Sequence, residues 1–191
     1  MQLSHKLPAA VLAVLAAATW AVPAAIDRAV EEPQATTTSS ETVSLEATGG
    51  SVLDFRAPGG WTTTPSGTRS SVTYTKPKDE QTLHISVLDQ SKDFDTTADR
   101  VLRQEALAGT SAAFDGGTVT SPSGFSGKSC VAIKPDDKAT GPCAVVHKGD
   151  LVVAVTATST GKDQAPDLQS LVDSFTVAQS DAAGTDEESG E

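Results

Sequence analysis

Residues 124–159, GFSGKSCVAIKPDDKATGPCAVVHKGDLVVAVTATS, decide the fold of this chain. They contain three short apolar runs separated by two turn sequences, PDDK at 135–138 and KGD at 148–150. Pro, Asp and Gly favour tight turns, so the segment predicts three antiparallel strands in a meander. Its last run, 151–157, is almost entirely apolar and predicts a central strand that is buried on both faces.

The same segment holds both cysteines of the chain, Cys130 and Cys143. If Lys134 and Ala139 flank the first turn, the two cysteines lie directly opposite each other on neighbouring strands, near the separation that a disulfide requires. Closing a loop of this size stabilises a fold by about 3 kcal/mol in the chain-entropy model. The alternatives are unpaired or intermolecular thiols and a redox pair, although redox pairs usually show the spacing CxxC at a helix N-terminus.

The sequence before the meander predicts five more strands and a helix. The strands are expected at 43–47, 51–55, 69–76, 81–89 and 116–121. Asp95 or Thr96 is expected to cap the helix, and Gly109 to end it. Its apolar face is formed at helical spacing by Ala98, Val101, Leu102 and Ala106.

A second helix is expected after the meander, with Pro166 in its first turn. Its apolar positions are Ala165, Leu168, Leu171, Val172 and Phe175. Hairpins, and not βαβ crossovers, would join the strands of this chain. The predicted fold class is therefore α+β, an antiparallel sheet of hairpins with two packed helices.

An apolar run at 7–26 follows Lys6 near the N-terminus. Val22 and Ala24 are small residues suited to cleavage after Ala24, so residues 1–26 are interpreted as a signal peptide. An uncleaved N-terminal membrane anchor is the alternative, because about 20 apolar residues can span a bilayer. Both interpretations export the rest of the chain, either secreted or anchored at the outer face of the cytoplasmic membrane in the cell envelope. A lipid-modified N-terminus is excluded, since no cysteine lies nearby.

The formal net charge of −11 lies mainly outside the predicted domain, 43–178. A Thr/Ser-rich acidic linker at 27–42 and an acidic tail at 179–191 have the composition of disordered segments. Residues 51–178 are nearly balanced, with 15 acids and 12 bases. Nucleic acid is therefore not an expected partner, and membrane contact is expected only through the N-terminal segment if it is uncleaved.

The sequence contains no constellation of residues that indicates catalysis, a cofactor or a metal. The predicted domain has two histidines, His84 and His147, whereas zinc sites need three or four ligands at recognisable spacing. Ser126 lies in half of a nucleophile elbow, but Lys128 replaces the second glycine. The chain is expected not to be an enzyme. The alternative is an extracytoplasmic hydrolase or small-molecule-binding protein whose site residues lie far apart in the sequence.

Trp61 is the candidate residue for binding a partner. It follows Pro58, Gly59 and Gly60, which favour a turn. A tryptophan on a turn can anchor a partner, and packing over the edge of the core is the alternative. A groove between the sheet and a helix is the other place where binding is expected.

The chain combines the pattern FxAPxGW at 55–61 with a strand ending in YxxP at 74–77, an amphipathic helix and a hairpin-rich half closed by a helix. In this combination it resembles the LpqN/LpqT-like exported proteins of actinobacteria. The resemblance covers about 43–178 and implies a Mog1/PsbP-like α/β/α sandwich with no known catalytic residues. The lipoprotein members carry a lipobox cysteine that this chain lacks. The resemblance implies a cell-envelope binding or accessory module, which we expect to engage a protein or lipid partner.

Overall fold

The computed structural model describes residues 35–37, 41–64, 67–76, 78, 80–89, 93–161 and 167–178. These residues all belong to one compact unit, Ala35–Glu191. The predicted export segment, most of the linker and the acidic tail lie outside them. No helix in this part of the chain is long and apolar enough to cross a membrane.

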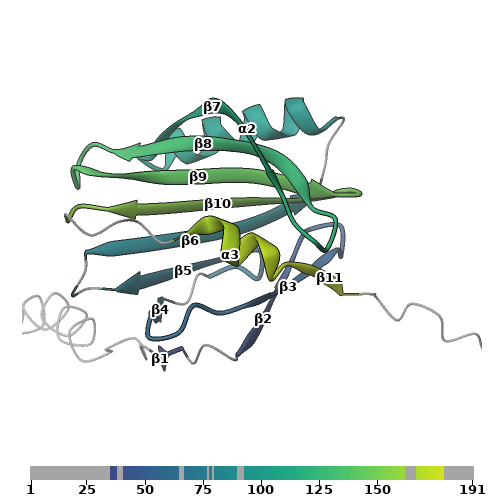
Figure 1. Ribbon diagram of the computed structural model, residues 1–191, viewed down its shortest axis with the longest axis horizontal. Coiled ribbons are helices and arrows are strands. Elements are labelled where there is room, and N and C mark those ends of the chain that lie inside the picture. Colours follow the sequence, from purple (N-terminus) through teal and green to yellow (C-terminus); the bar gives the residue numbers. More distant parts are fainter. Residues whose placement is uncertain are drawn as a thin grey trace, which may run out of the picture. The chain divides into compact units, whose positions relative to one another are not determined.

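The described residues form two antiparallel sheets (Figure 1). The large sheet has, in spatial order, β1 (Ala35–Thr36), β4 (Thr62–Thr64), β5 (Ser71–Lys76), β6 (Gln81–Asp89), β10 (Leu151–Ser159), β9 (Ala139–Lys148), β8 (Ser126–Lys134) and β7 (Ser111–Thr120). The small sheet has β11 (Thr176–Ala178), β3 (Val52–Arg56) and β2 (Thr42–Glu46). With two helices, α2 (Phe94–Leu107) and α3 (Leu168–Asp173), the predicted α+β class is confirmed.

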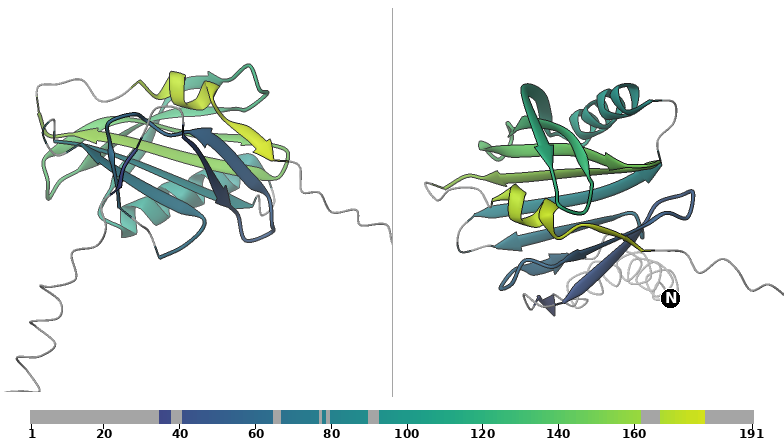
Figure 2. Two further views of the ribbon diagram at one scale, coloured as in Figure 1. Left: turned by 90° about the horizontal axis from the view of Figure 1, so that it is seen from below. Right: turned by 45° about the vertical axis from the view of Figure 1, so that its right-hand side comes forward.

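The two helices lie on opposite faces of the large sheet (Figure 2). Ala98 and Val101 of α2 pack on one face, against Val145, Val152 and Ala154. Alternate residues of the same strands point to the other face, where they pack with α3 and with the small sheet. The sequence predicted both helices on the sheet but did not predict the small sheet that shares a face with α3.

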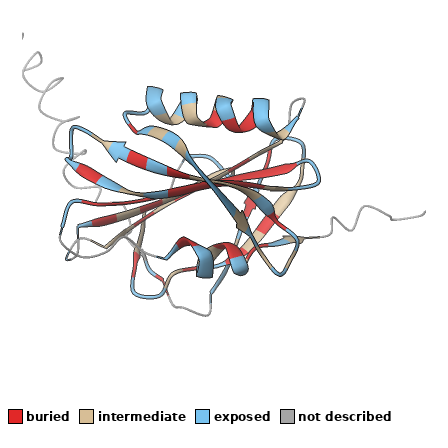
Figure 3. Ribbon diagram, turned by 45° about the horizontal axis from the view of Figure 1, so that its top comes forward, coloured by how far each residue is buried: buried red, intermediate tan, exposed pale blue. Residues whose placement is uncertain are grey.

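Strand β10 is the central strand that the apolar run predicted. It lies between β6 and β9, and all nine of its residues are buried. Figure 3 shows the buried residues concentrated in the central strands of the large sheet and in parts of the two helices. Three phenylalanines extend the core toward the small sheet, with Phe175 in edge-to-face contact with both Phe55 and Phe125.

The predicted register of the meander is also confirmed. Lys134 is paired with Ala139 across the β8–β9 turn, and Cys130 is paired with Cys143. The two cysteines form a disulfide with a Cα–Cα distance of 4.8 Å, and the chain has no free cysteine. The disulfide therefore joins β8 to β9, as predicted, and the redox and unpaired alternatives do not describe the structure.

Several predicted element boundaries were wrong for local reasons. Asp93 caps α2, not Asp95 or Thr96, because its carboxylate accepts a hydrogen bond from the Thr96 N–H at 2.8 Å. Ala106, predicted on the apolar face of the helix, is exposed. Strand β7 begins at Ser111, and Gly116, predicted as its start, lies inside a bulge with φ 84°.

Candidate functional site

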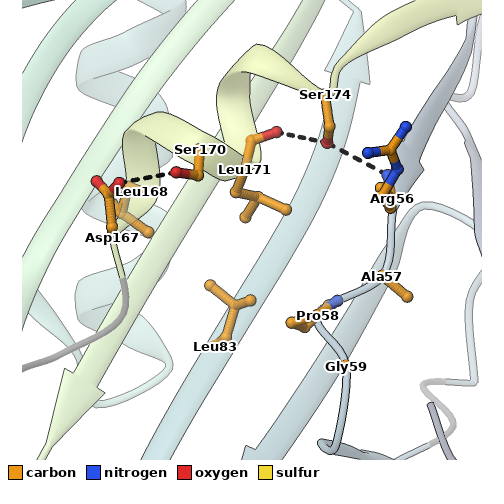
Figure 4. Close-up of a pocket in the computed structure, with 10 residues that line it drawn as sticks. All are labelled: Arg56, Ala57, Pro58, Gly59, Leu83, Asp167, Leu168, Ser170, Leu171 and Ser174. Atoms are coloured by element: carbon orange, nitrogen blue, oxygen red, sulfur yellow. Dashed lines mark hydrogen bonds between the residues drawn. The ribbon is translucent and has the colours of Figure 1, made fainter. Parts of the chain in front are cut away.

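A cavity of about 350 Å³ lies between α3 and the segment that follows β3 (Figure 4). It occupies one face of the large sheet, in the groove between sheet and helix where the sequence allowed a binding site. The residues that line it are Arg56, Ala57, Pro58, Gly59, Leu83, Asp167, Leu168, Ser170, Leu171 and Ser174. They come from three segments far apart in the sequence, which explains why no local motif marks the site.

The wall formed by 57–59 is held in place by hydrogen bonds to the chain before β2. The Ala57 N–H donates to the Glu41 carbonyl at 2.9 Å, and the Thr37 hydroxyl donates to the Pro58 carbonyl at 2.5 Å. Gly60 then takes φ 78°, a left-handed conformation that glycine adopts without strain. This turn therefore presents a fixed apolar wall, Ala57 and Pro58, to the cavity.

Leucines from the sheet and the helix provide the rest of the apolar lining. Leu83 projects from β6, and Leu168 and Leu171 project from α3 (Figure 4). Leu83 and Leu168 are buried, so their contribution to the cavity is an enclosed apolar surface. Burial of an apolar group in the cavity favours its binding by about 25 cal/mol for each Å² of apolar surface that is removed from water.

The polar side chains at the two ends of α3 form hydrogen bonds within the protein. The Asp167 carboxylate caps α3 by accepting hydrogen bonds from the Gln169 N–H at 3.0 Å and the Ser170 hydroxyl at 2.8 Å. These two hydrogen bonds hold the pKa of Asp167 below its ordinary value, so the carboxylate stays charged. The Ser174 hydroxyl donates to the Leu171 carbonyl at 2.6 Å and accepts from the Arg56 N–H at 3.2 Å.

Arg56 differs from the other polar residues of the lining in the surroundings of its charged group. Its side chain is exposed at the rim of the cavity, at the end of β3. Among the residues that the structure describes, no hydrogen bond or ion pair to its guanidinium group is found. The guanidinium group is therefore available to an anionic group on a ligand.

Trp61, the predicted partner-binding residue, is a core residue in the structure. Only 6% of its surface is exposed, and it belongs to the same apolar cluster as Phe55 and Tyr74. The turn at 58–60 directs the side chain inward, because the chain enters β4 immediately afterwards and pairs with β5. The packing alternative therefore describes Trp61, and the interpretation as an exposed anchor was wrong.

The two histidines have separate structural surroundings. The His84 Nδ1 lies 3.0 Å from the Thr73 hydroxyl, and its Nε2 lies 3.9 Å from a Glu105 carboxylate oxygen on α2. The His147 ring stacks on Phe94 with 4.3 Å between centroids. No group of three or more His, Cys, Asp or Glu residues in the described part of the chain could hold a metal ion.

Tyr74 is buried beside the cavity wall, since it is paired with Leu83 on the neighbouring strand. Burial, together with the negative charge of Glu41, raises the pKa of Tyr74 to about 12. We expect the phenol to ionise near pH 12 in the folded protein and near pH 10 in the unfolded chain. Because Tyr74 is the only tyrosine of the chain, the ultraviolet absorbance of the phenolate reports it directly.

The raised pKa also predicts how stability depends on pH. The folded state favours the neutral phenol, so this contribution to stability is complete below pH 10 and is lost as the pH rises from about 10 toward 12. Tyr74→Phe is the matched control, since it lacks the ionising group and should lose less stability over the same range. A native titration of Tyr74 centred near pH 10 would contradict the prediction.

The cavity therefore combines an apolar lining with one cationic residue, Arg56, at its rim, and its described lining residues include no paired nucleophile and base. Sequence reasoning identified the turn that forms its wall but not Arg56, Leu83 or Leu171 as site residues. Comparison of the sequence with models of known protein families and with curated proteins finds no match.

Proposed function

We propose that this chain is an exported, non-enzymatic binding module of the cell envelope whose cavity beneath α3 receives a lipid or another small apolar ligand. The observation that carries the proposal is the cavity itself. Its volume of about 350 Å³ falls within the usual range of small-molecule sites. Its lining combines several apolar side chains with a few polar groups, which is also typical of such sites.

Two features support export. The apolar run at 7–26 has the composition of a signal peptide or anchor. The Cys130–Cys143 disulfide is of a kind that persists mainly in oxidising compartments. Secretion and attachment at the outer face of the membrane both agree with these features.

A relationship to the LpqN/LpqT-like proteins is part of this proposal. Helices on both faces of an antiparallel sheet agree with a Mog1/PsbP-like sandwich, and the small sheet would be an addition beside α3. The FxAPxGW pattern would then have a structural role, since it supplies the cavity wall and a buried tryptophan. Such a role agrees with a binding or accessory module that has no catalytic residues.

The neutral apolar fluorophore N-phenyl-1-naphthylamine tests whether the cavity binds ligands. We expect its fluorescence to rise when it binds the native protein, and Leu171→Trp, which fills the cavity, to weaken binding at least about fivefold. Leu107→Trp is the matched control, because Leu107 lies on α2, is 90% exposed and does not line the cavity. Circular dichroism melting would establish that both variants are folded.

Two outcomes would count against the proposal. One is the absence of any fluorescence rise with the folded wild-type protein. The other is equal binding by the wild type, Leu171→Trp and Leu107→Trp, which would place the fluorophore elsewhere on the surface.

A further inference from the structure

We propose that the ligand of the cavity is a single-chain amphiphile with a carboxylate head, whose chain lies over Leu83 and Leu171 and whose carboxylate binds the Arg56 guanidinium group. This inference rests on the proposed function, because it assigns a ligand class to the same cavity. It follows from the charges and hydrogen bonds at the two ends of the cavity (Figure 4).

Among the described residues that line the cavity, Arg56 is the only one with a cationic side chain. The hydroxyl groups of Ser170 and Ser174 already donate to acceptors within the protein, at 2.8 Å and 2.6 Å. Among the lining side chains that the structure describes, the Arg56 guanidinium group is therefore the available hydrogen-bond donor. Its planar arrangement of N–H groups matches the two oxygens of a carboxylate.

The opposite end of the cavity disfavours the reverse orientation. Asp167 lies there, and its carboxylate remains charged because it caps α3. A ligand carboxylate placed near Asp167 would be repelled, whereas one placed near Arg56 would be attracted. The charges at the two ends therefore favour one orientation of the ligand, with its carboxylate at Arg56.

A cationic head is also disfavoured, although Asp167 could attract one. Both carboxylate oxygens of Asp167 already accept hydrogen bonds, from Gln169 and Ser170. A cation bound there would gain only an ion pair exposed to water, which contributes little to binding. The same cation placed at the other end would be repelled by Arg56.

Between the ends, most of the described lining residues offer the ligand apolar contacts. Ala57, Pro58, Leu83, Leu168 and Leu171 carry no polar side-chain group. A sugar or a nucleotide would leave its hydroxyl groups without partners along this stretch, which is unfavourable when they are removed from water. An unbranched alkyl chain leaves no polar group unsatisfied, so chain and head together define a monocarboxylate amphiphile.

Displacement of N-phenyl-1-naphthylamine by three ligands with the same alkyl chain tests the inference. The ligands are decanoate, decan-1-ol and decyltrimethylammonium, each used below the concentration at which it forms micelles. We expect decanoate to bind the wild type at least about threefold more tightly than decanol, as suits an ion pair at an exposed rim, and the cation to bind most weakly. The advantage of decanoate should shrink at about 0.5 M salt.

Arg56→Gln should remove the difference between decanoate and decanol while leaving decanol binding unchanged. Arg69→Gln is the control, since Arg69 is an exposed arginine that pairs with Glu46 at 3.4 Å and does not line this cavity. Equal binding of decanoate and decanol to the wild type, both blocked by Leu171→Trp, would overturn this inference and leave the proposed function standing. If neither the fluorophore nor any of the three ligands binds, both this inference and the proposed function are overturned.

Discussion

Replacing Trp61 with alanine is expected to lower the free energy of unfolding by about 3–5 kcal/mol. The side chain is 6% exposed and packs in the apolar cluster that joins the two sheets. Its removal leaves a cavity bordered by β-strands, which cannot easily collapse because their pairing fixes their separation. Urea denaturation followed by circular dichroism would measure the change.

Leu107→Ala is the matched control for this experiment. It also removes a large apolar side chain, but Leu107 is 90% exposed, so the expected change is within about 0.5 kcal/mol. If Trp61→Ala unfolds at the same urea concentration as the wild type, Trp61 is not a core residue in solution. The interpretation of Trp61 as an exposed anchor would then regain support.

The sequence predicted the large sheet well where its strands are long and apolar. In β10 the apolar run is continuous, because both faces of this strand are covered. The register of β8 and β9 could be predicted because the turn at 135–138 sets which residues lie opposite each other. Long-range pairing of β6 with β10 is not marked by any turn and became visible only in the structure.

The small sheet could not be predicted, because its last strand is short and distant. Strand β11 has three residues, too few to show a period, and it pairs with β3 from the other end of the chain. Strands β1 and β4 are similarly short, with two and three residues. Such strands form because neighbouring elements hold them in place, so their own sequences carry little signal.

The sequence allowed a groove between the sheet and a helix, but the residues that line it could not be predicted, for a related reason. Leu83 and Leu171 look like ordinary core residues in their own strand and helix patterns. Arg56 looks like an ordinary exposed residue at the end of β3. Their common role arises only because α3 packs across the sheet and faces the segment 57–59. The one available signal was Pro58, because proline restricts the backbone of the turn that forms the cavity wall.

Reduction of the Cys130–Cys143 disulfide is expected to lower the free energy of unfolding by about 3 kcal/mol. The two cysteines are separated by 13 residues, so the bond restricts a short loop in the unfolded chain. A loss of this size should lower the melting temperature by about 10 °C for a domain of this length. Thermal unfolding of the wild type with and without a thiol reductant would measure it.

A comparison of the reduced wild type with a variant that lacks both cysteines separates the effect of the bond from that of the packing of its sulfur atoms. Both cysteines are buried and pack with Ala132, so Cys130→Ala/Cys143→Ala removes contacts as well as the bond. The reduced wild type keeps those side chains and loses the bond alone. It should therefore be less stable than the oxidised protein and more stable than the double variant. Equal melting temperatures of the oxidised and reduced wild type would show that β8 and β9 are held together by their backbone pairing and by the core, and that the bond adds nothing to stability.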